Sequence, residues 1–463
     1  MVLKLEDLLD FFQSNLSEIH FGQLKNLKKQ QDLIKVEEFL SWARRTKNLK
    51  ITSYDIPSSI LKNSKLHDIK IDSRGPDDKV YDKNEELRLK VARGNSILET
   101  NQNGKIDHKL VIYALRKFTG GLGDEDDLDR NSKDWKNYFI RDFSYVRQVF
   151  SLQKANGEAA HFSCSWIDGE FLLCSGSKNV HLVFKNKNDL MNFTEQRFSY
   201  AKIISETILN FLDRLDTDLK IKFLSFLCLF NLTVVFEILN PDTQHVEDLS
   251  YLTEPLLMFI TFTSNVIDPK PNSLCSMAPD CAIQIANLFK LNTVKMEIVD
   301  HSSIEDHLCK IRKDHSYEGV VLYFLDSEFN VIGLLKKKTA WYIIVRAIRE
   351  KLRYHTSPKN NASICELETR VKSRLKSIQN WIGFSDKECD EWLALLTQFC
   401  QWFDERFKKN FISRDDFSNK FPVLWSKFLD ESSLTDKIEI SINQNENSTI
   451  KNLNENIEKM SLN

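Results

Sequence analysis

Residues 149–157 read Val-Phe-Ser-Leu-Gln-Lys-Ala-Asn-Gly, an apolar run that ends at a lysine and a glycine. An apolar run closed by Asn-Gly is typical of a strand and the turn after it. The pattern Lys154-Ala155-Asn156-Gly157 is weak alone, because by composition it arises by chance in roughly one chain of this size in five. Its meaning therefore depends on the residues C-terminal to it.

Three further elements come after it in order, and each is accompanied by an apolar predicted strand. One predicted strand carries Glu237 near its end, a second starts directly after Glu318, and a third runs into the basic triplet 336–338. An acid at a strand end and a Lys-x-Lys triplet are each common in proteins. Their order and spacing after Lys154 are what is informative.

In this order the elements resemble the covalent nucleotidyltransferase superfamily of ligases and capping enzymes. The details are similar to the RNA ligase 1 branch, which holds phage tRNA-repair ligases and the adenylyltransferase domain of fungal tRNA ligases. The matching segments are Ala92-Arg93-Gly94, Arg116-Lys117-Phe118, Lys154–Gly157, Ser177-Lys178, Phe236-Glu237, Glu318-Gly319, Lys336-Lys337-Lys338 and Trp341-Tyr342. The resemblance covers about residues 90–345. Asn156 stands where most of the superfamily has Asp, as it does in the fungal enzymes.

The resemblance implies an α+β fold, in which a nucleotidyltransferase domain of ATP-grasp-like antiparallel sheets and flanking helices precedes an all-helical C-terminal domain. We expect four segments: a helical extension over 1–60, the adenylyltransferase domain over 61–345, a helical RNA-binding domain over 346–432 and a disordered Asn-rich tail over 433–463. Periodicity alone predicts helix to about residue 50, loops over 54–86 and short β-like runs from 88, beginning with 89–92.

The resemblance implies that Lys154 is a nucleophile, which attacks the α-phosphorus of ATP and releases pyrophosphate. The AMP then passes from Lys154 to an RNA 5′-phosphate. Finally, an RNA 3′-hydroxyl displaces the AMP. An amine must be neutral to attack, yet a free lysine has a pKa near 10.4, which costs about 4.6 kcal/mol at pH 7. Neighbouring cations and a bound metal would lower the pKa of Lys154. Lys336 and Lys338, Lys178 and Mg²⁺ are the candidates.

The resemblance also implies an ATP site with a metal. Its residues are Arg93, Lys117, Asn156, Gly157, Lys178, Glu237, Tyr251, Glu318, Lys336 and Lys338. Glu318 and Glu237 supply the hard oxygen ligands that Mg²⁺ takes, although both could also be exposed strand ends. Lys117 and Lys178 could be plain surface lysines. The aromatic that stacks on adenine is Tyr251 or a neighbour, with Phe259 as the alternative.

Two finer matches concern the RNA ends. Fungal tRNA ligases carry a His-Val after the third motif and an Arg-x-x-Arg after the fifth, both implicated in recognising a 2′-phosphate beside the 3′-hydroxyl. His245 and the pair Arg346 and Arg349 match them here. Two arginines three residues apart share a helix face and suit a dianionic phosphate. His245 could equally be a surface histidine, and the arginines could grip backbone phosphate.

The composition of this 463-residue chain is globular, with a formal net charge of -2. That neutrality hides an island over 336–376, where twelve bases face three acids, a net +9. Such an island is either a solvated helix face or a footprint for polyphosphate or nucleic acid. Nine cysteines without a CxxC pair exclude a zinc knuckle and indicate reduced thiols. We therefore expect an intracellular protein, cytoplasmic or nuclear, with no membrane span.

The resemblance implies that the chain is an ATP-dependent RNA ligase of the tRNA-ligase type, active in tRNA splicing or RNA repair, and we expect it to be a monomer. ATP and Mg²⁺ are the expected cofactors, and tRNA halves or broken RNA ends the expected partners. The sequence contains neither a phosphate loop nor an HxT pair, so separate kinase and phosphodiesterase proteins would prepare the ends. The alternatives are an mRNA-capping guanylyltransferase and a non-catalytic RNA-binding protein on a ligase scaffold.

Overall fold

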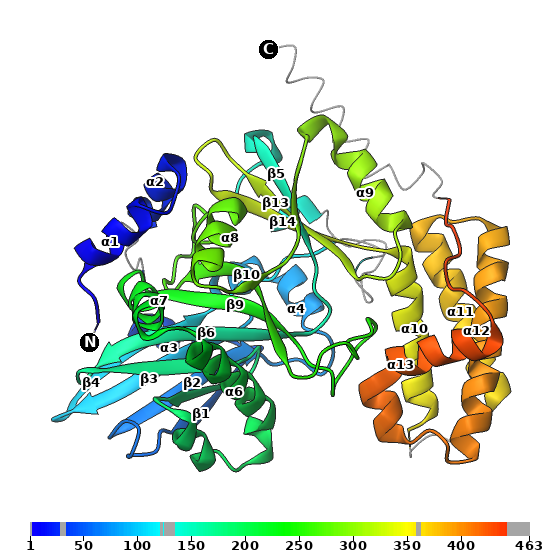
Figure 1. Cartoon of the computed structure of the whole chain (residues 1–463), viewed down its shortest axis with the longest axis horizontal. Coiled ribbons are helices and arrows are strands. Elements are labelled where there is room, and N and C mark those ends of the chain that lie inside the picture. The colour runs from blue at the N-terminus through cyan, green and yellow to red at the C-terminus, as the bar shows by residue number, and fades with distance from the viewer. Residues whose placement is uncertain (1, 28–33, 121–123, 125–134, 358–362, 442–463) are drawn as a thin grey trace.

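In the computed structural model, three β-sheets with flanking helices stand beside a bundle of helices formed by the C-terminal part of the chain (Figure 1). The structure describes residues 2–27, 34–120, 124, 135–357 and 363–441. The α+β class with antiparallel sheets and a helical C-terminal region is thereby confirmed. Within the described residues, no helix has the length and apolar character needed to cross a membrane.

The first sheet is a meander of four antiparallel strands. Its order is β1 (Leu49–Asp55), β2 (Ser64–Ile71), β3 (Asn95–Gln102) and β4 (Lys105–Tyr113). Helix α3 (Val36–Arg45) packs its apolar side on this sheet through Phe39 and Leu40. The short helices α4 (Asp78–Lys83) and α5 (Glu85–Lys90) fill the connection between β2 and β3.

The second sheet has six strands and carries the largest apolar core. Its order is β11 (Asn292–Thr293), β10 (Leu256–Ser264), β9 (Leu232–Leu239), β6 (Glu158–Ile167), β7 (Glu170–Ser177) and β8 (His181–Phe184). The helices that share its core are α1 (Leu5–Gln13), α2 (Glu18–Leu27), α6 (Ser199–Arg214), α7 (Thr217–Leu229) and α8 (Pro279–Leu288). The Asp168-Gly169 turn between β6 and β7 forms the hairpin that its sequence predicts.

The third sheet is buried on both faces. Its order is β12 (Met296–Val299), β5 (Gln148–Gln153), β13 (Gly319–Leu325) and β14 (Val331–Lys338). One face packs on α9 (Ile304–Lys313) through Val320 and Leu322. The other face, with Phe150 and Val321, packs toward residues of β10 and α8. Burial on both sides explains why β13 is apolar along its whole length.

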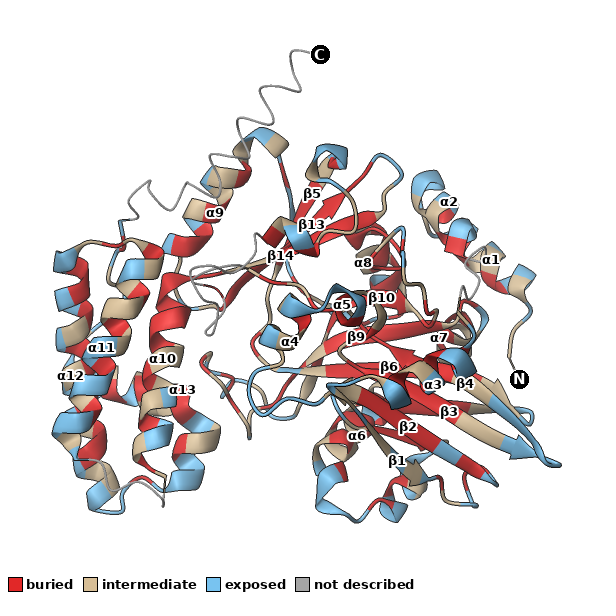
Figure 2. Cartoon of the chain, turned by 180° about the vertical axis from the view of Figure 1, so that it is seen from behind, coloured by how far each residue is buried: buried red, intermediate tan, exposed pale blue. Residues whose placement is uncertain are grey.

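Four helices build the C-terminal bundle: α10 (Ala340–His355), α11 (Ile364–Ile382), α12 (Asp386–Lys408) and α13 (Arg414–Ser432). Three of them begin with a Ser that caps the helix and an acid three residues later that caps in return. Their apolar sides face inward, as Figure 2 shows. Trp392 and Trp425 lie in this core, whereas Trp381 and Trp402 are half-buried under Arg374 and Arg406.

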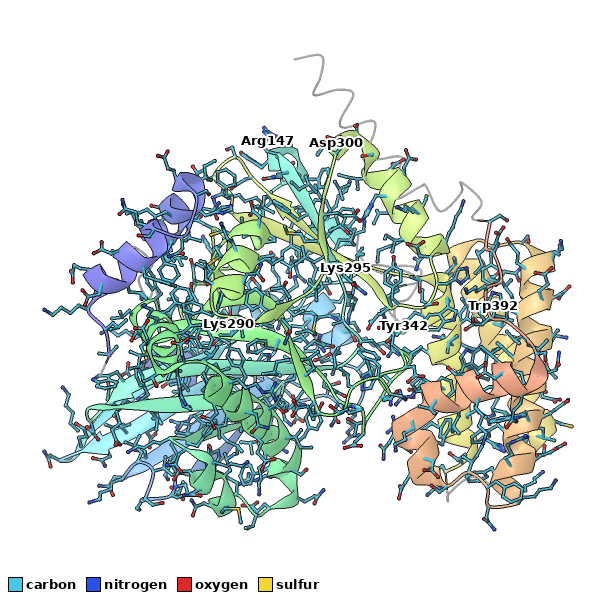
Figure 3. All side chains as sticks on the ribbon, viewed as in Figure 1. Arg147, Lys290, Lys295, Asp300, Tyr342 and Trp392 are labelled. Carbon is cyan, nitrogen blue, oxygen red and sulfur yellow. The ribbon has the colours of Figure 1, made fainter. Side chains whose placement is uncertain are left out.

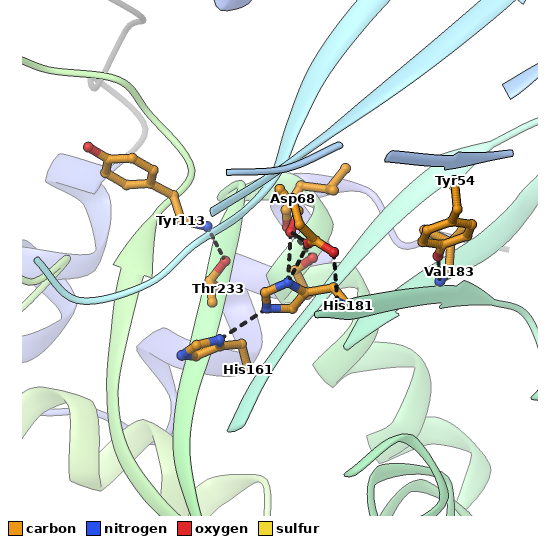
Figure 4. Close-up of polar contacts among 10 residues, drawn as sticks. Tyr54, Asp68, Tyr113, His161, His181, Val183 and Thr233 are labelled. Atoms are coloured by element: carbon orange, nitrogen blue, oxygen red, sulfur yellow. Dashed lines mark hydrogen bonds and ion pairs between the residues drawn. The ribbon is translucent and has the colours of Figure 1, made fainter. Parts of the chain in front are cut away.

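The structure corrects several local predictions. Residues 64–71, expected as loop, form β2, whose buried Asp68 is satisfied by hydrogen bonds to protein groups. The Ser96 hydroxyl donates to Asp68 at 2.6 Å. His181 Nδ1 lies 2.8 Å from Asp68 Oδ1, and His161 Nδ1 lies 3.1 Å from His181 Nε2. Figure 4 shows Asp68, His181 and His161 in this row. Of the predicted β-like run 89–92, residues 89 and 90 instead end α5, a helix that Asn84 caps by accepting from the Leu87 N–H at 3.1 Å, and residues 91 and 92 lead on toward β3.

The chain ends also differ from the prediction. The helical N-terminal segment stops at Arg45, and residues 49–55 join the first sheet as β1. Residues 433–441, which composition assigns to a tail, lie on the bundle, where Ile440 is buried and Asp436 accepts from the indoles of Trp341 and Trp425. The rest of the predicted tail, 442–463, lies outside the described residues. All nine cysteines are free thiols.

Candidate active site

Lys154 lies where the chain leaves the third sheet for the second. It directly follows β5, and β6 begins four residues later at Glu158. The backbone N–H of Lys154 donates to the Gly319 carbonyl at 2.8 Å, which ties the crossing to the start of β13. A Cβ on Gly157 would lie 2.2 Å from the Ile238 carbonyl oxygen of β9, so only glycine fits. Residues 154–157 are therefore held from both sheets at once.

Carboxylates surround the Lys154 amine. Its Nζ lies 3.1 Å from Glu318 Oε2, and Glu318 is 4% exposed, which excludes an ordinary exposed strand end. Glu237, half-buried on β9, accepts from the Gly157 N–H at 3.2 Å. A third carboxylate, Glu247, accepts from the Glu318 N–H at 2.6 Å. The sequence did not single out Glu247, because no strand or turn pattern marks it.

The charge state of Lys154 is opposite to the one expected. Burial lowers the pKa of its amine, but the charges of Glu318, Glu237 and Glu247 outweigh burial and hold that pKa above its ordinary value. Burial likewise raises the pKa of Glu237, whereas the cations Lys154 and Lys338 hold the pKa of Glu318 low against burial. Lys154 is thus a charged lysine paired with carboxylates, and the neighbouring cations alone do not produce the expected lowering of its pKa.

The side-chain amide of Asn156 is buried and makes hydrogen bonds to four residues in three other segments of the chain. Its Nδ2 donates to Glu318 Oε2 at 2.8 Å and to the Tyr342 hydroxyl at 3.2 Å. Its Oδ1 accepts from the N–H groups of Val246 and Glu247, at 3.0 and 3.1 Å. Tyr342, on α10, is labelled in Figure 3, where the sheets meet the bundle. Asn156 therefore positions Glu318 and the segment that carries His245.

The basic triplet at the end of β14 faces the same place. Lys338 is cross-strand partner to Gly319 and Lys336 to Val321, so both lie at the end of β13 that follows Glu318. Lys338 is buried, with its amine 5.7 Å from the centre of the Tyr342 ring. The charge of Lys336 contributes to lowering the pKa of Asp78. Lys338 thus lies at the site of Lys154, where its charge helps to lower the pKa of Glu318, whereas Lys336 acts on Asp78.

A buried ion pair that the sequence did not predict holds the end of β14. The Arg312 guanidinium, 0% exposed on α9, donates to both carboxylate oxygens of Asp124 at 3.1 and 2.9 Å. Arg312 also donates to the Lys338 carbonyl at 2.7 Å, and Asp124 accepts from the Lys338 N–H at 2.6 Å. Asp124 belongs to the acidic stretch 124–127, whose other residues lie outside the described part of the chain.

Three cations that the resemblance places in the ATP site, Arg93, Lys117 and Lys178, meet two carboxylates at the start of α4. Arg93 Nε lies 3.6 Å from Asp77 Oδ2, and Lys178 pairs with the same oxygen. Lys117 pairs with Asp78, and with 4% exposure it is no plain surface lysine. Burial alone would raise the pKa of Asp78, but Lys117 and its neighbours lower it to about 2. The cations are brought together, and no sequence pattern marks their acidic partners.

Two of the three residues predicted for the RNA ends, His245 and Arg349, act on one carboxylate, that of Glu158. His245 Nε2 lies 3.1 Å from Glu158 Oε1. The hydrogen bond from His245 lowers the pKa of Glu158, and the charges of Arg349 and Lys178 add to the effect. Arg346 lies one turn before Arg349 on α10, and the charge of Arg346 acts against burial in setting the pKa of Tyr342. Three elements distant in sequence therefore direct positive charge at Glu158.

The two aromatic residues considered for stacking on adenine, Tyr251 and Phe259, differ in exposure. Tyr251 is 72% exposed in the segment between β9 and β10 that also carries His245. Phe259, the alternative, is fully buried, with its ring 4.7 Å from that of Phe262 and 6.3 Å from that of Phe236. Phe259 is thus a core residue without a free face, which leaves Tyr251 as the candidate.

The donor set suits Mg²⁺ that also binds phosphate. Glu318, Glu237 and Glu247 are hard oxygen donors, and the last two have raised pKa values because burial and neighbouring carboxylates disfavour their charge. A dication would relieve that repulsion. No group of three or more His, Cys, Asp or Glu within the described residues has the arrangement of a metal site by itself. Mg²⁺ commonly takes one or two protein carboxylates and completes its shell with water and phosphate oxygens.

Comparison with known proteins finds likeness in structure only. No protein-family model and no curated protein matches the sequence. Form 1 of an archaeal ATP-dependent RNA ligase aligns at a TM-score of 0.42 and 13% identity, over 80% of this chain and 77% of that one. Form 2 aligns at 0.38 and 15%, over 68% and 69%. A lysine-to-alanine mutant of Naegleria gruberi RNA ligase with ATP and Mn aligns at 0.27 and 12%, over 64% and 97%.

Proposed function

We propose that the chain is an ATP-dependent RNA ligase that works through a lysyl-AMP intermediate on Lys154. The observation that carries the proposal is the arrangement around its amine: Glu318 at 3.1 Å, Glu237 close by, and Lys338 on the strand paired with β13. A lone nucleophilic lysine between carboxylates and cations suits transfer of a phosphoryl group that carries an adenosine.

The proposed reaction has three balanced steps. Lys154 Nζ, after losing a proton, attacks the α-phosphorus of ATP, and the bond to pyrophosphate breaks. An oxygen of the RNA 5′-phosphate then attacks the same phosphorus, breaks the phosphorus–nitrogen bond and returns the amine. Finally, a 3′-hydroxyl attacks the RNA 5′-phosphorus and AMP leaves. Each step adds charge at phosphate oxygens, which fixed cations stabilise in a site already organised before the reaction.

Each group of residues has a distinct task in this scheme. Lys336 and Lys338 oppose the charge that develops on the transferred phosphate, and Arg93, Lys117 and Lys178 orient the distal phosphates of ATP. Glu318 and Glu237 would hold Mg²⁺, which supplies further positive charge against the phosphates. Because Glu318 now pairs with the Lys154 amine, engaging Glu318 elsewhere would free that amine to lose its proton. Tyr251 would stack on adenine.

The proposed substrate end carries a 2′-phosphate next to the 3′-hydroxyl, as in tRNA ligation. His245, Arg346 and Arg349 would bind that phosphate, and two of them, His245 and Arg349, already act on the carboxylate of Glu158. A dianionic phosphate makes stronger contacts with an arginine fork than a carboxylate does. The basic bundle would hold the body of the RNA, and separate end-healing proteins would supply the 5′-phosphate.

Labelling with α-³²P nucleotides tests the activity. We expect label on the protein from ATP with Mg²⁺, no label in Lys154→Ala, and transfer of the label to a 5′-phosphorylated RNA. Label from GTP in place of ATP would indicate a capping guanylyltransferase. Absence of label with both nucleotides in a folded protein would contradict the enzyme and leave an RNA-binding protein.

Ligation of matched ends tests the substrate. Two RNAs that differ only in a 2′-phosphate at the 3′ end would be joined by the unaltered chain and by His245→Ala and Arg349→Ala. We expect both variants to lose the preference for the 2′-phosphate end while they retain label from ATP. Equal rates for both ends in the unaltered chain would reject the tRNA-ligase assignment and leave the ligase activity intact.

A further inference from the structure

A cavity of about 360 Å³ opens next to the pair Arg93 and Lys178. Its walls come from the edge of the first sheet and from residues 72–77, which lead into α4. The cations that line it are Lys50, Lys70, Arg93 and Lys178, and the carboxylates are Asp72 and Asp77. Nothing in the reaction described above uses Lys50 or Lys70.

Lys50 and Lys70 form an unfavourable pair in the strand register. They are direct partners across β1 and β2, and like charges in that position destabilise a sheet. Within the described residues neither lysine takes part in an ion pair. By contrast, Lys65 at the other end of β2 lies 3.5 Å from its cross-strand partner Asp55. The sheet thus keeps two repelling lysines at the rim of a cavity although it pairs opposite charges elsewhere.

On the inner wall of the cavity, the positive charges outnumber the carboxylates that pair with them. Arg93 and Lys178 share a single carboxylate, that of Asp77. Arg93 Nε is buried and makes no hydrogen bond to any described residue. Burial and the nearby Arg93 charge lower the pKa of Lys178, which shows that the two cations repel each other. An anion with several oxygens would satisfy these groups together.

The cations continue in both directions from Lys178. On one side, Lys178 and Arg349 both act on Glu158, which His245 contacts. On the other side, the series passes Arg93 and ends at Lys50, which is exposed on the edge strand β1. A chain of phosphates, unlike a single nucleotide, can follow such a series from the RNA-end residues out to the protein surface.

From this arrangement we propose that, once pyrophosphate has left, the cavity holds a backbone phosphate of the RNA substrate, bound by Lys50 and Lys70 together with Arg93 and Lys178. The proposal rests on the RNA ligase function and adds a second contact to the RNA strand beyond its reacting end. Lys50 and Lys70 would bind the phosphate through charge and without reading the base. They would make no contact with ATP.

The double variant Lys50→Ala/Lys70→Ala tests the proposal by separating the ATP step from the RNA steps. We expect formation of lysyl-AMP from labelled ATP, and its KM for ATP, to stay within twofold. Transfer of AMP to a 5′-phosphorylated 20-mer should need about tenfold more RNA for half-maximal rate at 0.1 M salt. The slope of log K against log salt should become shallower by about 0.7 for each lost phosphate contact.

A matched control removes two charges at the other end of the same strand, Lys65 within it and Lys62 just before it. Lys62→Ala/Lys65→Ala changes the net charge equally and should leave RNA binding and its salt slope unaltered. Lys50→Arg/Lys70→Arg should retain binding. Because Lys50→Ala/Lys70→Ala removes the repulsion between the two lysines, its Tm should be unchanged or raised. A slower transfer of AMP to RNA in this variant would therefore not reflect misfolding.

The outcomes are distinguishable. A higher KM for ATP in Lys50→Ala/Lys70→Ala, with unchanged RNA binding, would overturn the proposal and assign the cavity to ATP or pyrophosphate. Equal losses in the test and control variants would overturn it too, because the effect would then be one of net charge. Failure of the unaltered chain to form lysyl-AMP would instead contradict the proposed function itself.

Discussion

At the scale of single residues, Asn156 explains how a neutral amide serves where an acid would be expected. It donates to Glu318 and Tyr342 and accepts from two backbone N–H groups, so all four hydrogen-bonding positions are used. A carboxylate there could keep the two backbone donors but could not donate to Glu318. It would also add a further negative charge to a site that already holds three carboxylates.

We therefore predict that Asn156→Asp slows formation of lysyl-AMP by about 10- to 100-fold. The size reflects the loss of a buried hydrogen bond to a charged acceptor, worth about 1.5–3 kcal/mol, before repulsion from Glu318 is added. The single-turnover rate with labelled ATP measures it. Asn188→Asp, on the surface far from the site, serves as the control, and an equal rate in both variants would contradict the assigned role.

The protonation of Asp78 makes the stability of the fold depend on pH in the acid range. Its pKa is about 2 in the fold, against an ordinary value of 3.8. The ion pair with Lys117 therefore contributes stability that is fully present above pH 3.8 and is lost as pH falls through about 2. The difference corresponds to roughly 2 kcal/mol. Asp78→Asn should lower the Tm at pH 7 and flatten the fall of Tm between pH 4 and 2, in thermal melts across that range.

The sequence could indicate Lys154, both acids and the basic triplet because each accompanies an apolar strand in order. It could not indicate Asp77, Asp78, Glu158 or Glu247 as their partners. These carboxylates lie in a short helix, at a strand start and in a connecting segment, where no periodicity marks them. Their role arises only when distant segments meet, and the raised pKa of Lys154 is a result of that meeting.

At the scale of elements, α4 places carboxylates where the phosphates of ATP would bind. Asp77 pairs with Arg93 and Lys178 just ahead of the helix. ATP must therefore displace a carboxylate before its phosphates reach these cations. We predict that Asp77→Asn lowers the KM for ATP severalfold in the labelling reaction, with little change in the maximal rate. Asp82→Asn, in the same helix, is the control; a higher KM would mean that Asp77 positions the cations rather than competing for them.

The contact between α9 and β14 predicts a second effect. Arg312→Met would leave Asp124 buried without its cation, at a cost of about 3–5 kcal/mol. The double change Arg312→Met/Asp124→Asn removes both charges and keeps an acceptor for the Lys338 N–H. We expect it to recover much of the Tm lost in the single variant, while lysyl-AMP formation stays slow because Lys338 is no longer held. Full recovery of the rate would contradict a positioning role.

Elements differ in how well the sequence predicts them. The strands β9, β13 and β14 are recognisable because they are buried on both faces and read as continuous apolar runs. Strand β2 is not, because His67 and Asp68 are buried inside it. The desolvation cost of burying Asp68 is offset by hydrogen bonds to partners on other strands, Ser96 and His181. Local composition cannot report a hydrogen bond that spans over a hundred residues.

At the scale of the whole molecule, the helical bundle and the sheets are joined at the candidate site. Helix α10 begins two residues after Lys338, and its Tyr342 reaches Asn156 at 3.2 Å. Residues 433–441 then return to the start of that helix. There Asp436 Oδ2 accepts from the indole N–H groups of Trp341 and Trp425, at 2.5 and 2.8 Å.

Asp436→Ala should therefore loosen the bundle. Two buried indoles would lose a charged acceptor, at a cost of about 1–3 kcal/mol. We expect a lower Tm followed by tryptophan fluorescence, and slower lysyl-AMP formation at temperatures near the transition. Asp430→Ala, exposed on α13, is the comparison. Identical melting of the two variants would show that the return of the chain to Trp341 contributes nothing.

The carboxylates that face the cations of the candidate site have a consequence for selectivity. Arg93, Lys117, Lys178 and His245 each already have an acidic neighbour in Asp77, Asp78 or Glu158. A chloride or a single phosphate ion offers too few contacts to displace them. A polyanion that engages several cations at once can exchange with all three carboxylates together. The protein would in this way stay indifferent to simple ions and respond only to ligands with phosphates at the right spacing.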